Sequence, residues 1–396
     1  MQTQIELIKN NNLKTRKIKK EIDSFFEVSN DRDIDEEVER LFQYYRKNGF
    51  PNYDINEYNP EEELNKIIKF NEETIFNNKD LGQTMHGCGF LWTFFPHWID
   101  VKYKTEQKTL RENWDDDEKL RSLILKTYKW QLKFGRGVFT TNRIRQNAKV
   151  YCSKQSVSNF RPTVAKYLYN QFGNKGVVWD MSAGWGGRLL GFLASDCKKY
   201  IGTEPSLKSF NGLFKIKKTY DYIDKEIELN CVGSETIVPA EPNSVDLCFT
   251  SPPYFDTEEY SQEATQSFKA YPTKELWIDK FMKQTIKNCK VALKDNGYLI
   301  INISNTKTND WIEQETIKIA LKEGFKFIDT YYLVLSSIAG KGKKREPIFI
   351  FRKTTLSEEK DIKKVAVEKG LRKLRKKSKN ITKKNKRKGE SIWDKW

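Results

Sequence analysis

The chain has 396 residues, of which 38% are hydrophobic, and it carries a formal net charge of +17. This size and composition allow one large core or two smaller ones, so we expect a catalytic domain with an accessory region. No apolar run is long enough to span a membrane, and residues 1–20 are too polar for a secretory signal. We therefore expect a cytoplasmic protein, nuclear if the host is eukaryotic, with no membrane partner.

Cysteine and histidine usage argues against a metal site. The six cysteines are dispersed without a Cys-x-x-Cys pair, and the chain has only two histidines. Neither a structural zinc site nor a disulfide framework is expected from this pattern.

Residues 1–155 are predicted to form a mainly helical region, with polar stretches marking the loops. Within it, residues 87–98 are rich in aromatic side chains and contain two glycines. Such a segment can stack on bases or fill a core, and we favour core packing.

From about Val157 short apolar runs alternate with helical stretches, which indicates an α/β domain over residues 156–355. The runs at 327–335 and 347–352 are too close for a crossover helix, so we predict an antiparallel hairpin. The expected fold is Rossmann-like, with a mostly parallel seven-stranded sheet that ends in this hairpin. The other predicted strands are 176–179, 199–202, 227–230, 245–249 and 298–303, and the predicted helices lie near 186–196, 206–220, 274–293 and 310–323.

Residues 356–396 are predicted to form a basic, partly disordered tail. Positions 360–396 hold sixteen Lys and Arg against four Asp and Glu, a net charge of +12, which leaves +5 for the rest of the chain. Such a tail suits a nucleic-acid backbone through counterion release, although a tail that only increases solubility has the same composition.

A glycine-rich loop follows the first predicted strand of the α/β domain. The strand ends at Asp180, and Gly184, Gly186 and Gly187 follow before the next helix. This order allows a nucleotide-like ligand close approach to the backbone at the carboxyl edge of the sheet. Glu204 ends the second strand, where it could bind ribose hydroxyls or simply start a helix. A carboxylate at Asp180 favours S-adenosylmethionine over a phosphate-bearing cofactor.

The fourth strand ends in the motif Ser251-Pro252-Pro253-Tyr254. Methylation of an aromatic exocyclic amine needs acceptors that hold the N–H groups and turn the lone pair toward the methyl donor. The Ser251 hydroxyl and the Pro252 carbonyl can serve as these acceptors, because the two prolines restrict the backbone. Tyr254 offers a ring on which an extruded base could stack.

Taken in order, the glycine loop, Glu204 and the Ser-Pro-Pro-Tyr motif resemble the S-adenosylmethionine-dependent DNA amino-methyltransferases, over about residues 157–353. Many members act in restriction systems and phages. The resemblance implies that DNA is the partner, that the Ser-Pro-Pro-Tyr loop is catalytic, and that a segment around Phe160 also contacts the cofactor. Ser234, or its neighbour Glu235, would replace an aspartate that the family places near the cofactor's adenine ring. The implied cofactor-binding residues are Phe160, Asp180, Ser182, Ala183, Gly184, Trp185, Gly186, Glu204 and Ser234, and the implied catalytic residues are Ser251, Pro252, Pro253 and Tyr254.

The motif favours cytosine N4 slightly over adenine N6 as the target, because serine in its first position resembles the cytosine enzymes. An RNA base methyltransferase, such as one acting on guanine N2 of tRNA, is the alternative, so RNA remains a possible partner. Protein-glutamine methyltransferases normally begin this motif with asparagine, so Ser251 argues against that activity. Target recognition is expected from residues 1–155, the loop at 255–272 or the tail. The acidic part of that loop, residues 256–261, would meet the base edge or close over the site. The oligomeric state is left open.

Overall fold

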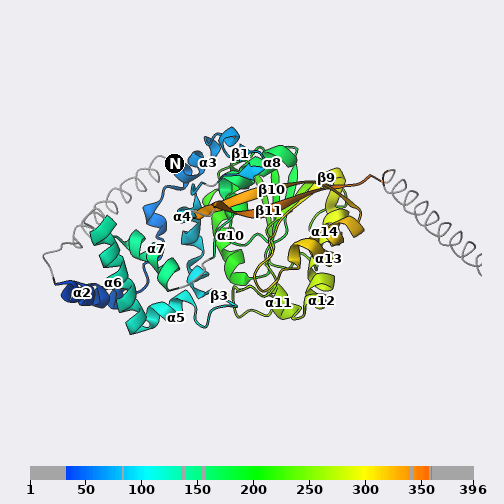
Figure 1. The fold of residues 1–396 in the computed structure, drawn as a ribbon. Helices are drawn as coiled ribbons and strands as arrows, with labels where there is room; N and C mark the ends of the chain where they lie inside the picture. The colour runs from blue at the N-terminus through cyan, green and yellow to red at the C-terminus, as the bar shows by residue number, and fades with distance from the viewer. Residues whose placement is uncertain are drawn as a thin grey trace, which may run out of the picture.

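The computed structural model describes residues 33–82, 84–134, 139–152, 157–338, 342–355 and 358. A nine-stranded sheet runs through this part of the chain, and helices cover both of its faces (Figure 1). Apart from Glu358, the predicted tail at 356–396 lies outside the described residues. None of the helices in the described part is both long and apolar enough to cross a membrane.

The strands are short at the N-terminal end of the chain and longer toward its end. They are β1 (Phe76–Asn77), β2 (Asp80–Leu81), β3 (Lys102–Tyr103), β4 (Val177–Asp180), β5 (Lys199–Thr203), β6 (Glu226–Asn230), β7 (Val245–Thr250), β8 (Glu258–Glu259), β9 (Leu293–Asn302), β10 (Phe325–Ile338) and β11 (Gly342–Lys353).

The helices fall into an N-terminal set and a set that packs on the sheet. They are α2 (Ile34–Asn48), α3 (Pro60–Ile68), α4 (Cys88–Leu91), α5 (Leu110–Asp115), α6 (Asp117–Phe134), α7 (Thr141–Tyr151), α8 (Pro162–Phe172), α9 (Gly187–Leu193), α10 (Leu207–Thr219), α11 (Ser267–Ala270), α12 (Lys274–Leu276), α13 (Lys283–Ala292) and α14 (Ile312–Lys322). A π-helical turn, Trp277–Met282, joins α12 to α13.

The order of the large sheet is β1-β2-β10-β11-β9-β7-β4-β5-β6. β4 pairs in parallel with both β5 and β7, and the chain passes through β5 and β6 before it returns on the other side of β4. The direction of winding therefore reverses between β4 and β7. In open α/β sheets ligands bind at such a point, outside the carboxyl ends of the strands.

The predicted α/β fold is confirmed. All seven predicted strands are present, and β11 lies between β9 and β10 and is antiparallel to both. The two additional strands, β1 and β2, come from the N-terminal region and extend the sheet beside β10. Each has only two residues, too few for an alternating pattern to be recognised in the sequence.

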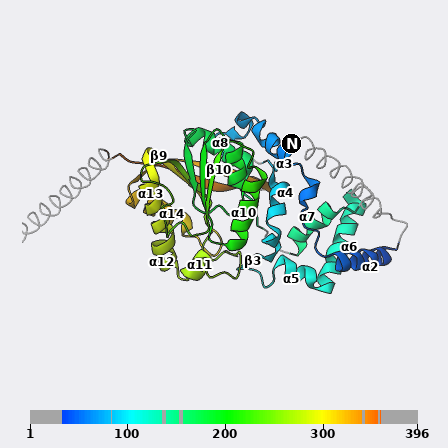
Figure 2. The same ribbon diagram turned by 180° about the vertical axis from the view of Figure 1, so that it is seen from behind.

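The N-terminal helices lie beside the α/β domain. Figure 2 shows α2, α5, α6 and α7 on one side of α10, with α13 and α14 on the other. The expected boundary at residue 155 does not interrupt the packing, because one hydrophobic cluster contains side chains from Val38 to Ile350. The aromatic segment 87–98 is part of this cluster, and Phe90, Phe95 and Trp98 are almost completely buried. Core packing, rather than base stacking, accounts for these rings.

The contact between α8 and α9 depends on a glycine. A Cβ atom added at Gly191 would lie 2.6 Å from the carbonyl oxygen of Pro162 and 2.6 Å from the Cβ of Ala165. We expect Gly191→Ala to reduce the free energy of unfolding by about 1–3 kcal/mol, because the two helices must move apart. Gly82→Ala is the matched control, since its nearest neighbour would be 3.5 Å away. Equal denaturation midpoints for the two variants in urea would contradict this packing.

Candidate active site

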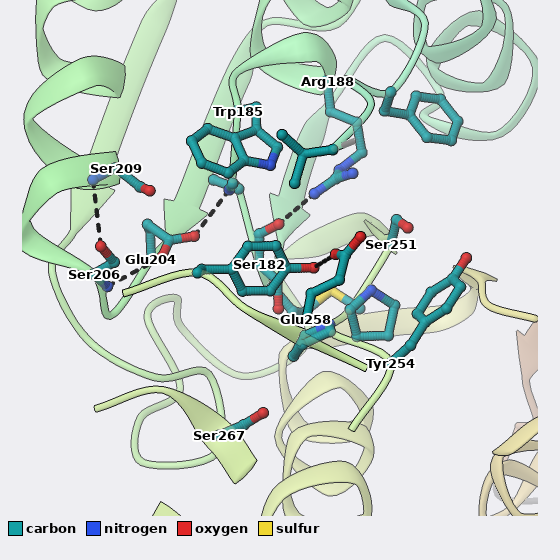
Figure 3. Close-up of a pocket in the computed structure, with 18 of the residues that line it drawn as sticks. Ser182, Trp185, Arg188, Glu204, Ser206, Ser209, Ser251, Tyr254, Glu258 and Ser267 are labelled. Carbon is teal, nitrogen blue, oxygen red and sulfur yellow. Dashed lines mark hydrogen bonds between the residues drawn. The ribbon is translucent and has the colours of Figure 1, made fainter. Parts of the chain in front are cut away.

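A cavity opens at the carboxyl ends of β4, β5 and β7, where the winding of the sheet reverses (Figure 3). Loops from both halves of the α/β domain line it, and eleven of the thirteen predicted site residues are among the lining residues. These eleven are Phe160, Ser182, Ala183, Gly184, Trp185, Glu204, Ser234, Ser251, Pro252, Pro253 and Tyr254. Asp180 and Gly186 are not among the residues that line this cavity.

The glycine loop turns sharply between β4 and α9. Gly184 has φ 54° and Gly186 has φ 76°, values in the left-handed region that favours glycine. A Cβ atom added at Gly187 would lie 2.0 Å from the carbonyl oxygen of Phe160. The backbone around Phe160 therefore passes directly over the start of α9. Asn159 fixes the same segment, because its side-chain amide donates to the carbonyl of Trp185 over 2.7 Å. Phe160 is thereby held at the wall of the cavity.

Asp180 lies beneath the loop, and its side chain is completely buried. Its Oδ2 atom accepts hydrogen bonds from Nε of Arg188 at 2.9 Å and from the Tyr200 hydroxyl at 2.8 Å. Its Oδ1 atom accepts from the Thr250 hydroxyl at 3.2 Å. Because these protein groups occupy the carboxylate, the structure gives Asp180 a positioning role rather than a place at the wall. Arg188, which the sequence reasoning did not single out, also donates to the carbonyl of Ser182.

Glu204 lies at the end of β5 and faces the glycine loop. Its Oε2 atom accepts from the backbone N–H of Gly184 at 2.9 Å, and its Oε1 atom accepts from that of Ser206 at 3.0 Å. Burial raises the pKa of Glu204 to about 7, and these two backbone donors oppose that rise. The carboxyl group is thus fixed at the cavity wall and titrates near neutral pH.

Aromatic residues of the N-terminal region surround the indole of Trp185. Its ring centroid lies 5.5 Å from that of Trp92, 5.6 Å from Phe95 and 5.2 Å from His97. On the cavity side the ring of Tyr260 is 6.1 Å away. The accessory region therefore packs directly against the loop at the cavity, a contact that no local pattern in the sequence predicts.

Ser234 and Glu235 both line the cavity, but their side-chain oxygens differ in their hydrogen-bond partners. The Ser234 hydroxyl is paired with that of Thr285 at 3.0 Å. In contrast, Oε2 of Glu235 is buried and has no hydrogen-bond partner among the described residues, and burial raises the pKa of this carboxyl group. Of the two alternatives left open by the sequence, Glu235 has the unused acceptor.

The Ser251–Tyr254 loop, predicted from the sequence to be the catalytic loop, leaves β7, whose residues are buried throughout. Pro252 is buried, and Ser251 lies beside the Tyr254 hydroxyl. The next turn is fixed by polar contacts, since Asp256 pairs with Lys104 of the N-terminal region and accepts from the Asn309 side chain at 2.9 Å. The two-stranded ribbon β3-β8 follows, with Tyr103 directly opposite Glu258. The N-terminal region thus contacts the catalytic loop as well as the glycine loop.

The lining residues suit S-adenosylmethionine by their chemistry. Glu204 offers carboxylate oxygens for hydroxyl donors, and the unpaired Oε2 of Glu235 offers an acceptor for an amino group. The positive φ of Gly184 and Gly186 lets the loop turn without side chains that would obstruct a ligand. Among the described residues no group of three or more His, Cys, Asp or Glu is arranged to hold a metal ion.

Comparison with known proteins bears on the part of this site that follows β7. The model of the DNA methylase family for N6 and N4 methylation matches residues 245–396, from β7 onward. The resemblance to the DNA amino-methyltransferases is confirmed. The match includes Ser251 to Tyr254 and begins after the glycine loop and Glu204. It supports methyl transfer as the reaction of this chain.

None of the curated proteins matches the chain. Among solved structures, a methyltransferase from Methanosarcina mazei has 12% sequence identity and a TM-score of 0.33, with 45% of this chain and 92% of that chain covered. An O-methyltransferase from Thermotoga maritima has 12% identity and a TM-score of 0.35, with 52% and 71% covered. A putative methyltransferase from Listeria monocytogenes has 12% identity and a TM-score of 0.32, with 48% and 99% covered.

The buried pair of Asp180 and Arg188 should be essential for stability. We expect Asp180→Ala to lower the free energy of unfolding by about 3–5 kcal/mol, because it leaves the Arg188 guanidinium buried without its counter-charge. Glu226→Ala is the control, since Glu226 forms a 2.7 Å pair with Lys199 at the surface and should cost less than about 1 kcal/mol. Chemical denaturation of both variants measures the difference, and similar losses would contradict the role given to Asp180.

Proposed function

We propose that this protein is a DNA methyltransferase that transfers a methyl group from S-adenosylmethionine to the exocyclic amine of a flipped base, with cytosine N4 favoured over adenine N6. One observation carries the proposal. The glycine loop with Glu204 and the loop Ser251-Pro252 line the same cavity. A methyl donor and an acceptor amine can therefore meet within one site.

The part of the cavity that would bind the methyl donor is assigned from the hydrogen-bonding groups of its lining residues. Glu204 would hold the ribose hydroxyls, and Glu235 would accept from the adenine amino group. Phe160 and Trp185 would provide apolar walls, and Gly184 would permit close approach of the backbone. When bound, the cofactor supplies a methyl group on a positively charged sulfonium, so the leaving group needs no protonation.

The acceptor side is assigned to the catalytic loop. The Ser251 hydroxyl and the Pro252 carbonyl would accept hydrogen bonds from the target amine and direct its lone pair toward the methyl group. The ring of Tyr254 would stack on the base after its extrusion from the helix, since an amine inside a duplex cannot reach such a cavity.

The choice of cytosine rests on Ser251 in the first position of the motif. Purified protein should be incubated with methyl-labelled S-adenosylmethionine and with duplex DNA, single-stranded DNA or tRNA, and the products digested to nucleosides for mass spectrometry. We expect N4-methylcytosine in DNA. N6-methyladenine would change the target base, and N2-methylguanine in tRNA would replace the proposed function with RNA methylation.

Removal of the first amine acceptor should slow the chemical step. We expect Ser251→Ala to lower kcat roughly 100-fold, with little change in cofactor affinity, because one preorganised hydrogen bond to the reacting amine is lost. Ser244→Ala, at the opposite end of β7, is the matched serine control and should retain full activity. Single-turnover kinetics measure the effect, and an unchanged rate for Ser251→Ala would remove this hydroxyl from the mechanism.

Cofactor binding should depend on pH through Glu204. Because its pKa is raised to about 7, lowering the pH through neutrality adds a proton and removes the negative charge that attracts the ribose hydroxyls. The Kd for S-adenosylmethionine should therefore increase between pH 8 and pH 5. Glu204→Gln should bind more weakly at pH 8 and lose this dependence. Isothermal titration calorimetry tests both expectations, and parallel profiles for the two proteins would contradict them.

A further inference from the structure

Two glutamates outside the sequence motifs line the catalytic part of the cavity. Glu258 belongs to β8, and Glu346 belongs to β11. Figure 3 shows Glu258 between Ser182 of the glycine loop and Tyr254 of the catalytic loop. Each of the two carboxyl groups lies within electrostatic reach of Tyr254, and Glu346 is also within reach of Glu258. The site therefore contains a pair of acids beside the predicted position of the target base.

The structure holds Glu258 firmly in this place. Its Oε2 atom accepts a hydrogen bond from the Tyr260 hydroxyl, and the Tyr103 hydroxyl is a second donor to the carboxyl group. Tyr103 is paired directly opposite Glu258 in the ribbon β3-β8. These contacts involve neutral phenols, and no Lys or Arg forms an ion pair with Glu258 among the described residues. Its neighbour Glu259, in contrast, forms a 2.7 Å ion pair with Lys269.

Glu346 lies on β11 and also lines the cavity. It is opposite Leu333 in the β10-β11 hairpin, and both residues line the cavity. The charged and titratable groups around it are Lys344, Glu258, Tyr254 and Arg161. Burial raises the pKa of Glu346 and that of Glu258, and the repulsion between the two carboxylates adds to the rise for Glu346. Burial and the nearby like charge favour a state in which one of the two acids keeps its proton.

We propose that Glu258 and Glu346 recognise the flipped base at the ring nitrogen beside its exocyclic amine. This inference rests on the proposed function. Cytosine presents an amine donor at N4 beside an acceptor at N3, and adenine presents N6 beside N1. A carboxyl group that keeps its proton offers an O–H donor to this ring nitrogen, while Ser251 and Pro252 hold the two N–H groups of the amine. Thymine and uracil present a carbonyl beside an N–H and do not match it.

The proposal separates base recognition from the chemistry of methyl transfer. Ser251 and Pro252 direct the amine toward the donor, whereas the two glutamates test whether the neighbouring ring atom is an acceptor. It also gives a role to the acidic segment 256–261, for which the sequence left two alternatives, contact with the base edge or closure over the site. Contact with the base edge is the alternative favoured here.

The test uses DNA in which the ring nitrogen is replaced by carbon while the amine is kept, with 3-deazacytosine or 1-deazaadenine in place of the methylated base. Wild-type protein should transfer methyl groups to this DNA about 10- to 100-fold more slowly than to normal DNA. Glu258→Leu and Glu346→Leu should be slow on normal DNA, and for them the ratio of the two rates should fall toward one. Glu259→Gln is the control and should keep the wild-type ratio.

The glutamine variants keep the proposal testable if a leucine variant does not fold. An amide offers an N–H donor to the ring nitrogen, so Glu258→Gln or Glu346→Gln should retain discrimination against the deaza base. The wild-type rate should fall at alkaline pH, when the carboxyl proton is lost, and a glutamine variant should show a weaker fall. Cofactor Kd should stay unchanged in all four variants.

Three outcomes would overturn the proposal. An unchanged ratio in folded leucine variants, together with an unchanged pH profile in the glutamine variants, would exclude base recognition by these acids. A large increase in cofactor Kd for Glu258→Gln would assign this carboxyl group to the cofactor instead. Failure of the wild-type protein to methylate any DNA would refute the proposed function itself, and the inference with it, whereas normal methylation with unaffected variants would refute only the inference.

Discussion

The hydrogen bonds of one buried carboxylate hold the two halves of the site together. Asp180, at the end of β4, accepts from Tyr200 on β5, from Thr250 on β7 and from Arg188 in the first turn of α9. Thr250 directly precedes the Ser-Pro-Pro-Tyr loop, and Arg188 directly follows the glycine turn. Any displacement of the glycine loop relative to the Ser-Pro-Pro-Tyr loop would therefore break a charge-assisted hydrogen bond. Such a bond is strong in buried surroundings.

The N-terminal region reinforces the same arrangement from outside. Its aromatic segment surrounds Trp185 of the glycine loop, and its strand β3 pairs with β8 beyond the catalytic loop. The ion pair of Lys104 with Asp256 lies between these two contacts. A region that contacts both loops can influence base selection without supplying an atom that reacts.

The acidic residues of the site differ in their hydrogen-bond and ion-pair partners, and this difference distinguishes their roles. Asp180 is neutralised by Arg188, so it serves the architecture. Glu204 is fixed by backbone N–H groups, whereas Glu235 retains an oxygen without a partner among the described residues. Glu258 is held by phenols, which position a carboxyl group without cancelling its charge. Carboxyl groups that are buried but not paired with a cation are costly to maintain, which points to a ligand that uses them.

Much of the fold could be predicted from the sequence, and so could the glycine loop and the Ser-Pro-Pro-Tyr loop. Parallel strands are buried on both faces and appear as continuous apolar runs, so β4, β5 and β7 and their end residues were recognisable. Glycines permit a tight turn and consecutive prolines restrict the backbone, which made the two loops recognisable as well. These features depend on neighbours within a few residues, and the sequence contains that information directly.

Tertiary structure alone decided which carboxyl groups face the cavity and which are engaged by hydrogen bonds and ion pairs within the protein. The sequence could not show that Tyr200 and Thr250 bond to Asp180, because they are twenty and seventy residues away along the chain. Glu258 and Glu346 were not predicted for the same reason, since they are distant along the chain and only the fold brings both to the cavity. The two-residue strands β1, β2 and β3 carry no periodic signal. The sequence determined the loops that can do the chemistry, and only long-range packing determined which side chains surround them.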